Sequence, residues 1–553
     1  MPTQVLYEAA GLPKYTQQIP TSNPFNPLAI LQTPRITTSG NNTNDMTAKY
    51  DRYGLTSDPE GFSNEMRTKW TTEPDIDVLT TIVRRELDIG MHNELSVAFL
   101  ELSIEPLAKG PFSKLYTISY GGPVDYIMRV TPPVEPLRKS LSEQATIKFV
   151  RQNTNIPVPR VVARSKRSRS TLDFEWTIMQ RIPGDKLCNQ WHRMSRLKKY
   201  ELVRKLVEYQ VQLFNNRFPV IGSLYQTAVF RTLISVLPPS TVRPNIEESA
   251  FPYCLGQIVS APFFSRENRK LNTCRGPYTY AQHWLAARLQ IAAADVGNQP
   301  VCSDGKEEAF CGDSEDVTHE QILVLDEARI PIEVDDYISP VDAIIGISND
   351  SEQSDDNTSS DKKCEEDGDE LDVDPRAPLT AASTQSRIQR LINLLPEIFP
   401  IGGTEECMLF HHDLSGNNII TDQNHEISGI INWEGVHTVP LWFGCQLPKV
   451  LHSREVNELP PLRTVFEDEE DRNLYFRHFE DFEKTQLRSF FREEMQRVCP
   501  EWMQCHQAGS LKADFNLAVD TVALGATDHF ERWLKQVEQG AEPLNLRSAM
   551  DQF

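Results

Sequence analysis

HHDLSGNNII, residues 411–420, places Asp413 five positions before Asn418 in a short polar loop between apolar runs. Phosphoryl transfer needs a carboxylate that orients the acceptor hydroxyl and takes its proton. It also needs a side-chain carbonyl oxygen that holds magnesium on the nucleotide phosphates. The spacing of these two residues therefore predicts a phosphoryl-transfer loop. A chance spacing in an ordinary polar loop is the alternative, because short motifs recur freely.

The sequence on both sides predicts that this loop lies between β-strands. Residues 407–410 form a short apolar run before it, and residues 419–420 and 427–431 form two more after it. A turn-like segment at 421–425 joins the last two runs. We therefore expect a strand, the loop and then a hairpin whose second arm continues into the segment 432–434.

Two of these segments, HHDLSGNNII and GIINWEG (residues 429–435), resemble the aminoglycoside phosphotransferase and choline kinase-like family, and PLWFGCQLP (residues 440–448) resembles its fungal branch. The resemblance implies an α+β, protein kinase-like fold of two lobes, with a small antiparallel sheet in the N-lobe and a mainly helical C-lobe. It also implies ATP and Mg2+ as cofactors and a hydroxyl of a small molecule as the acceptor.

The family pattern assigns roles to four positions in these segments. It reads His-x-Asp-x-x-x-x-Asn and then Ile-Asp-Trp-Glu. By this resemblance His411 braces the loop, Asp413 is the catalytic base, and Asn418 and position 432 are metal ligands.

Asn432 departs from this pattern, which has an aspartate at that position. Magnesium favours charged oxygen ligands in an octahedral shell, and an amide offers one neutral oxygen. Glu434, Asp422 or a shifted water are the candidates for supplying the missing charge. Two functions stay open: an active phosphotransferase, and a catalytically impaired pseudokinase that acts as a nucleotide-binding or interaction module.

A second group of candidate residues lies far upstream, in the order expected of an N-lobe. Residues 126–130 predict a strand that carries Arg129, and residues 142–150 predict a helix that carries Glu143. In kinase-like folds a strand-borne cation contacts the α/β-phosphates and is held by a helix-borne glutamate. The resemblance gives these roles to Arg129 and Glu143. An ordinary surface salt bridge is the alternative.

A glycine-containing turn precedes this strand and supplies further candidates. Gly110 lies between two strand-like runs, and Ser113 and Lys114 follow it. We expect these three residues near the nucleotide phosphates, with a plain hairpin at Gly110 as the alternative.

Prolines set the end of the predicted helix. Pro157 and Pro159 lack the backbone donor that a helix needs and bias the preceding residues to extended geometry. The helix that includes Glu143 must therefore end near Asn153, before an edge strand or connector.

Residues 174–182 alternate like a strand and stop at Pro183-Gly184. This order resembles the hinge between the two lobes of a kinase-like fold, in which Gln180 to Ile182 face the adenine. Any strand that ends in a Pro-Gly turn is the alternative.

Length and composition predict a globular protein of more than one lobe. The chain has 553 residues, 39 % of them hydrophobic, which is more than one compact core usually holds. Its ten cysteines form no regular framework, as is typical of reduced thiols inside a cell. We assign residues 1–70 to a low-complexity N-terminal extension, 71–183 to the N-lobe and 184–553 to the C-lobe.

An acidic insertion accounts for most of the net charge of −22. Residues 303–376 contain 25 Asp and Glu against 5 Lys and Arg, a composition too polar to offset the cost of ordering the chain. Amphipathic helices at 278–294 and 384–399 flank it. We therefore expect a disordered insertion at residues 295–383. It is either a solvated linker or a docking site for a basic protein partner.

Residues 467–498 predict a long amphipathic helix with aromatic residues at helical spacing: Tyr475, Phe476, Phe479 and Phe482. Packing of these rings on the core is the prediction. A pocket for a cationic small-molecule substrate is the alternative.

No run of about 18 apolar residues and no typical secretory or mitochondrial presequence is present. We therefore expect a cytoplasmic protein with a small-molecule substrate and with neither membrane nor nucleic acid as a partner. A mitochondrial location is the alternative, because some relatives of this fungal branch are mitochondrial.

Overall fold

The computed structural model describes residues 55–57, 68–70, 72–87, 102–109, 113–121, 124–132, 137–165, 172–229, 252–264, 271–297, 381–461, 468–522 and 528–550, apart from positions 173, 272 and 404. The predicted phosphate-contacting Gly110, nearly all of the predicted acidic insertion and most of the N-terminal extension lie outside these residues.

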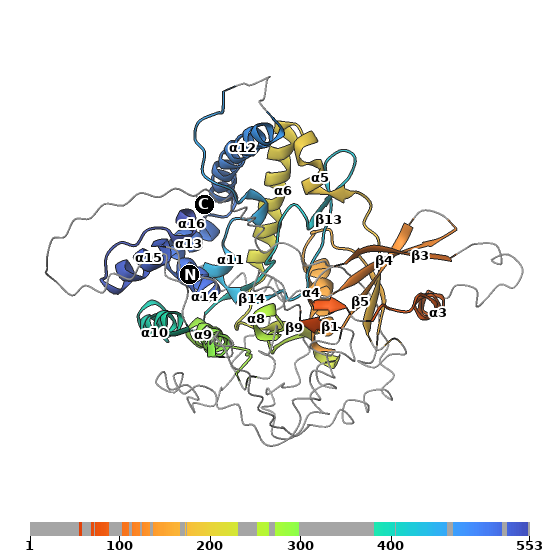
Figure 1. Cartoon of the computed structure of the whole chain (residues 1–553), viewed down its shortest axis with the longest axis horizontal. Helices are drawn as coiled ribbons and strands as arrows, with labels where there is room; N and C mark the ends of the chain where they lie inside the picture. The colour runs from red at the N-terminus through yellow and green to blue at the C-terminus, as the bar shows by residue number, and fades with distance from the viewer. Residues whose placement is uncertain are drawn as a thin grey trace, which may run out of the picture.

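A five-stranded antiparallel sheet forms one end of the molecule (Figure 1), in the order β3-β4-β5-β7-β6. β-Branched and aromatic residues are frequent in its central strands, which favours this conformation. The strands are Leu102–Lys109 (β3), Lys114–Tyr120 (β4), Val124–Thr131 (β5), Val161–Arg164 (β6) and Glu175–Gln180 (β7). Two further short strands, Leu55–Ser57 (β1) and Thr68–Trp70 (β2), pair with each other, and helix α3 (Ile76–Glu86) lies beside β3.

Helix α4, Arg138–Asn153, connects β5 to the edge of this sheet. It ends at the residue that the following prolines predict. Its start is fixed by Glu175 of β7, whose carboxylate accepts hydrogen bonds from the backbone N–H of Leu137, at 2.7 Å, and from the Ser140 hydroxyl. The predicted strand–helix order of this lobe is confirmed, and hydrogen bonds to Glu175 attach the start of α4 to the sheet.

Helices make up most of the other lobe (Figure 1). The predicted helices on either side of the acidic insertion are present as α9 and α10. The longer helices are Arg196–Asn215 (α6), Ala281–Gly297 (α9), Ala381–Ile398 (α10), Glu469–Val498 (α12), Pro500–Ala508 (α13), Ser510–Thr521 (α14) and Asp528–Glu538 (α15). The shorter ones are Leu187–Gln190 (α5), Ala261–Phe264 (α8), Leu441–Gly444 (α11) and Leu546–Met550 (α16). Together with the sheet, they confirm the predicted α+β, two-lobed, protein kinase-like fold.

Short strand pairs hold the predicted phosphoryl-transfer loop at the junction of the lobes. Cys407–Phe410 (β11) pairs with His437–Pro440 (β14), and Ile419–Thr421 (β12) pairs with Ile427–Ile430 (β13). β12 also pairs with Asp185–Lys186 (β8), directly after the predicted hinge. A separate hairpin joins Ser223–Gln226 (β9) to Tyr253–Gly256 (β10).

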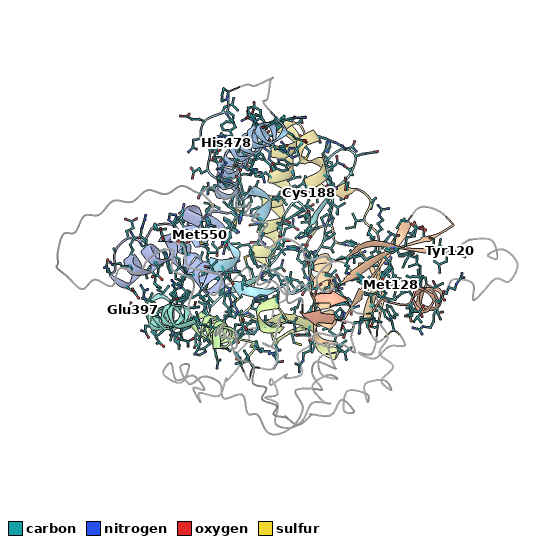
Figure 2. All side chains as sticks on the ribbon, in the orientation of Figure 1. Tyr120, Met128, Cys188, Glu397, His478 and Met550 are labelled. Atoms are coloured by element: carbon teal, nitrogen blue, oxygen red, sulfur yellow. The ribbon has the colours of Figure 1, made fainter. Side chains whose placement is uncertain are left out.

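One hydrophobic core extends from α4 and β5 into the helical lobe. Figure 2 shows how side chains fill the space between the sheet, which carries Tyr120 and Met128, and the helices, which carry His478 and Met550. Among the described residues, no helix is both long enough and apolar enough to cross a membrane.

The prediction that the α12 aromatics pack on the core was wrong. Phe476 is 45 % exposed, and Tyr475, Phe479 and Phe482 are only half-buried. The buried face of α12 starts later and is largely polar, and its residues are Asp481, Thr485, Leu487, Arg488, Phe491, Glu494 and Met495. Apolar residues at helical spacing do not reveal this face, because more than half of its buried side chains are polar.

We predict that Gly184→Ala destabilises the junction of the lobes. Gly184 has φ +129°, and an added Cβ would lie 2.3 Å from the backbone oxygen of Thr421 in β12. Backbone strain and overpacking together should cost about 2–4 kcal/mol of unfolding free energy. Thermal unfolding checks this. Gly402→Ala is the control, because an added Cβ there meets no atom within 4 Å. Equal melting temperatures for the two variants would contradict the prediction.

Candidate active site

His411 braces the predicted phosphoryl-transfer loop from within. Its Nδ1 accepts a hydrogen bond from the Asp413 backbone N–H at 3.2 Å. Nδ1 is thus an acceptor, and Nε2 carries the ring proton and donates to the Ile431 backbone oxygen at 2.9 Å. This imidazole therefore joins the loop to the residue directly after β13.

Burial keeps this imidazole neutral. It lowers the pKa of His411 to about 4, against the raising effects of the Ile431 oxygen and the Asp413 carboxylate. The Trp433 ring stands edge-on to it, with ring centroids 4.9 Å apart. A neutral ring of fixed orientation suits a structural brace rather than a proton carrier at neutral pH.

Asn418 holds the Asp413 carboxylate. Its Nδ2 donates to Asp413 Oδ2 at 2.6 Å and to the Asp413 backbone oxygen at 2.8 Å. The Asn418 Oδ1 atom is buried and has no hydrogen-bond partner. The two residues of the motif are therefore in contact, and one carbonyl oxygen beside the carboxylate is left for a ligand.

A buried group of four charged side chains joins the two lobes. Arg129 of β5 pairs with Glu143 of α4, as predicted, and its Nη1 also donates to Glu434 Oε2 at 2.9 Å. Lys139 of α4 pairs with the second oxygen of Glu434. All four side chains are at least nine-tenths buried, which excludes the alternative of a surface salt bridge for Arg129 and Glu143.

The two carboxylates of this group titrate differently. Burial raises the pKa of Glu143 to about 6, against the lowering effect of Arg129. Burial acts in the same sense on Glu434, but Lys139 and Arg129 together outweigh it and hold the pKa of Glu434 below its usual range. Glu434 is therefore the more firmly ionised of the two.

Asn432 and Trp433 connect the two parts of the site. Asn432 is buried and has φ +74°, a left-handed conformation that asparagine tolerates better than most residues. Trp433 is buried and donates from Nε1 to the Ile430 backbone oxygen at 3.0 Å. Ile431, which contacts His411, and Glu434, which contacts Arg129, thus flank one constrained turn.

Other predicted site residues have different surroundings. Ser113 and Lys114 are buried, and Lys114 pairs with Glu73. In the predicted hinge, the Gln180 backbone N–H donates to the Arg160 oxygen at 2.7 Å. The Ile182 side chain packs so closely on β13 that an added Cβ at Gly429 would lie 2.0 Å from Ile182 Cδ1.

The protein groups suited to magnesium do not complete the predicted site. Both oxygens of Glu434 are engaged by Arg129 and Lys139, and position 432 is a neutral amide. Asp422 instead holds its own turn by accepting from the backbone N–H groups of Asn424 and Glu426. Within the described ranges, no group of three or more His, Cys, Asp and Glu residues could hold a metal ion. Two buried oxygens of the motif have no hydrogen-bond partner, Asn418 Oδ1 and Asp413 Oδ1, and Lys449 lies 3.3 Å from the second of them.

Sequence reasoning missed two cations at this site. Lys139 lies one helical turn before Glu143 in α4, so the i, i+4 spacing could have indicated it. Lys449 lies 3.3 Å from Asp413 Oδ1. It comes from a 3-10 turn, Lys449–Leu451, beyond the motif, and no local spacing signals this contact.

The chain is similar to fungal proteins over part of its length, and no family model matches it. It is 28 % identical over 176 residues to a subtelomeric hrmA-associated cluster protein of Aspergillus fumigatus, and this match covers 32 % of each chain. It is 25 % identical over 242 residues to altered inheritance of mitochondria protein 9, mitochondrial, of Debaryomyces hansenii, which covers 38 % of this chain and 37 % of that protein. The matches thus span about a third of these relatives.

Two solved structures are similar at low identity. ADP-bound aminoglycoside phosphotransferase APH(2'')-Ib has 12 % identity and a TM-score of 0.38, covering 87 % of this chain and 100 % of that one. An ethanolamine kinase of Plasmodium vivax has 10 % identity and a TM-score of 0.34, covering 92 % of this chain and 97 % of that one.

We predict that His411 contributes to the loss of stability in acid. Its pKa is about 4 when folded and about 6.5 in an unfolded chain. The unfolded state therefore binds the proton more tightly. The stabilisation is complete above about pH 6.5 and is lost as the pH falls towards about 4. Urea unfolding should show that, between about pH 7.5 and about pH 5, the wild type loses about 2 kcal/mol more than His411→Gln. Parallel losses would contradict the assignment.

We predict that Glu434→Gln destabilises the free protein and that a polyanion partly restores it. The change leaves Arg129 and Lys139 with less negative charge in a buried site, at a cost of about 3 kcal/mol. Thermal unfolding with and without inorganic tripolyphosphate measures both effects. The control is Glu458→Gln at an exposed position, which should change neither. A stable Glu434→Gln variant that is indifferent to tripolyphosphate would contradict the role of Glu434.

Proposed function

We propose that this protein is an ATP-dependent phosphotransferase that transfers the γ-phosphoryl group to a hydroxyl of a small molecule. The proposal rests mainly on the contacts made at the two ends of the segment 431–434. At one end the Ile431 oxygen accepts from His411, which orients Asp413; at the other end Glu434 binds Arg129. The predicted base and the predicted phosphate-binding cation therefore converge on one short, constrained piece of chain.

The chemistry follows from the groups at these two ends. The acceptor oxygen forms a bond to the γ-phosphorus while the bond from that phosphorus to the β,γ-bridging oxygen breaks, and ADP leaves. The acceptor proton passes to the Asp413 carboxylate, which Asn418 Nδ2 holds in a fixed orientation. Arg129 and Lys139 are the cations that the nucleotide phosphates meet, in competition with Glu434.

Magnesium accompanies ATP in this proposal, but the chain offers it few ligand oxygens. The ion keeps several waters and takes most of its other ligands from substrate phosphates in many nucleotide sites. We assign Asn418 Oδ1 to this ion, because the atom is buried and has no hydrogen-bond partner. We keep Asn432 as a weak second ligand and expect the nucleotide to bind with a small magnesium dependence.

A nucleotide-binding module without catalysis is the second candidate. What favours it is Glu434, which already pairs with Arg129 and Lys139, together with the loss of a carboxylate at position 432. Both candidates keep the proposed lobes at 71–183 and 184–553.

The names of the relatives from Debaryomyces hansenii and Candida tropicalis contain the word mitochondrial. They support a mitochondrial location as the alternative to a cytoplasmic one.

The enzyme proposal predicts that Asp413→Asn separates binding from turnover. Hydrolysis of ATP by the full chain, with water as the acceptor, should fall about a hundredfold or more, because the general base is lost. The shift in melting temperature produced by ATP should persist, because a ligand that binds the folded state stabilises it by mass action.

Asn432→Asp is the matched gain-of-function variant. It should increase the part of the ATP-induced shift that requires magnesium, and it should raise the rate of hydrolysis. Absence of an ATP shift in the wild type would contradict both candidates. An ATP shift with no hydrolysis in either the wild type or Asn432→Asp would favour the binding module.

A further inference from the structure

We propose that Lys449 is a further catalytic residue, whose ammonium group binds the phosphoryl group during its transfer to the oxygen held by Asp413. This inference rests on the proposed phosphotransferase activity and deepens it. Lys449 directly follows the segment 440–448 and lies outside the two motifs at 411–420 and 429–435, and it reaches the site only through the fold.

The position of Lys449 is set by the catalytic loop itself. The backbone N–H of Val450 donates to the Leu414 oxygen at 2.9 Å, next to Asp413. Leu451 is fully buried and closes the same 3-10 turn by donating to the Pro448 oxygen at 2.9 Å. With the turn fixed on the loop, the Lys449 Nζ lies 3.3 Å from Asp413 Oδ1.

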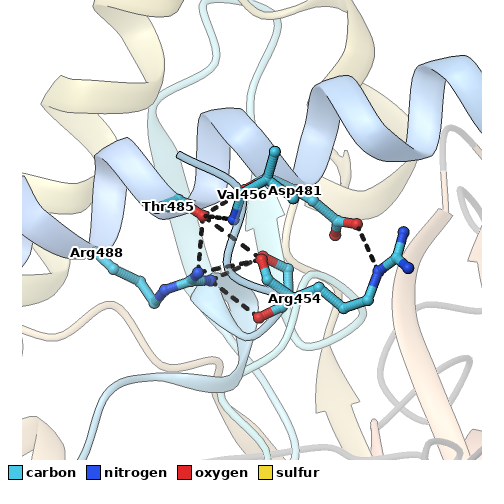
Figure 3. Close-up of polar contacts among 6 residues, drawn as sticks. Arg454, Val456, Asp481, Thr485 and Arg488 are labelled. Carbon is cyan, nitrogen blue, oxygen red and sulfur yellow. Dashed lines mark hydrogen bonds and ion pairs between the residues drawn. The ribbon is translucent and has the colours of Figure 1, made fainter. Parts of the chain in front are cut away.

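The polar face of α12 fixes the other side of this turn. Arg488 donates to the Leu451 backbone oxygen at 2.9 Å and to the Ser453 hydroxyl at 2.7 Å. It also donates to the Arg454 backbone oxygen at 3.2 Å (Figure 3). Thr485 accepts from the Val456 backbone N–H at 3.1 Å. A buried guanidinium that binds several backbone oxygens restrains the backbone directly after Lys449, and thereby fixes the point from which its side chain extends.

The Lys449 ammonium can bind a phosphoryl group while it pairs with Asp413. It carries three N–H donors, and Asp413 is the one carboxylate that it pairs with in the described part of the chain. The side chain is 38 % exposed, so a ligand can reach it. A fixed positive charge beside the base would stabilise the charge on the phosphoryl oxygens. It would also compensate for the weak metal site left by Asn432.

The test compares Lys449→Met with the wild type in the full chain. Affinities for ATP and for ADP are measured by thermal-shift titration, and hydrolysis of ATP is measured alongside. Lys449→Met should bind ATP about tenfold more weakly, as expected for one charge-assisted hydrogen bond, and should bind ADP within about twofold of the wild type. A role confined to holding Asp413 would leave the ATP to ADP ratio unchanged.

Two further variants keep the result interpretable. Lys198→Met is the control, because that lysine is similarly exposed, at 33 %, and pairs with glutamates on the helical lobe. Lys449→Arg should retain most of the preference for ATP, because the charge is kept. If Lys449→Met does not fold, Lys449→Gln takes its place, with the same expected loss of the preference for ATP. An unchanged preference for ATP over ADP in Lys449→Met overturns this assignment alone. A wild type that binds neither nucleotide overturns the phosphotransferase proposal and this assignment with it.

Discussion

The ion pair between Arg129 and Glu434 is the interaction on which the site depends, because it crosses from the sheet of one lobe to the turn that follows the predicted phosphoryl-transfer loop. Arg129 is on β5 and Glu434 lies 305 positions later. Lys139 and Glu143 complete the group, so two cations and two carboxylates share a buried volume. Such a group is costly to break, since loss of one partner leaves a buried charge uncompensated.

The segment that carries Glu434 connects this interaction to the predicted phosphoryl-transfer loop. Ile431 accepts from His411, Asn432 adopts a left-handed conformation and Trp433 is buried. The turn therefore has little freedom, and the positions of Asp413 and Arg129 are coupled through it. In the proposed reaction, a nucleotide competes with Glu434 for Arg129 and Lys139. Arg129 and Lys139 then bind either the nucleotide phosphates or Glu434, so phosphate binding weakens the contact between the lobes.

The sequence predicted most of the local structure because local rules decide it. Pro157 and Pro159 fixed the end of α4 at Asn153, and the apolar runs around the loop became β11, β12 and β13. The contact of Arg129 with Glu143 was also predictable, from the order of strand and helix together with the family resemblance. The role of Glu434 was not, because its partners come from another lobe. The buried face of α12 was missed because Thr485 and Arg488 bind backbone groups and Asp481 pairs with the Arg454 side chain, so these residues do not add to an apolar stripe. Lys449 was missed because only the fold brings it to Asp413.

A double-mutant cycle between the lobes tests this account most directly. The unfolding free energies of Arg129→Met, Glu434→Gln and the double variant are compared with that of the wild type. We predict that the two changes interact by at least about 1.5 kcal/mol, as close buried charge pairs do. Costs that add within about 0.5 kcal/mol, as they do for residues that do not touch, would contradict it.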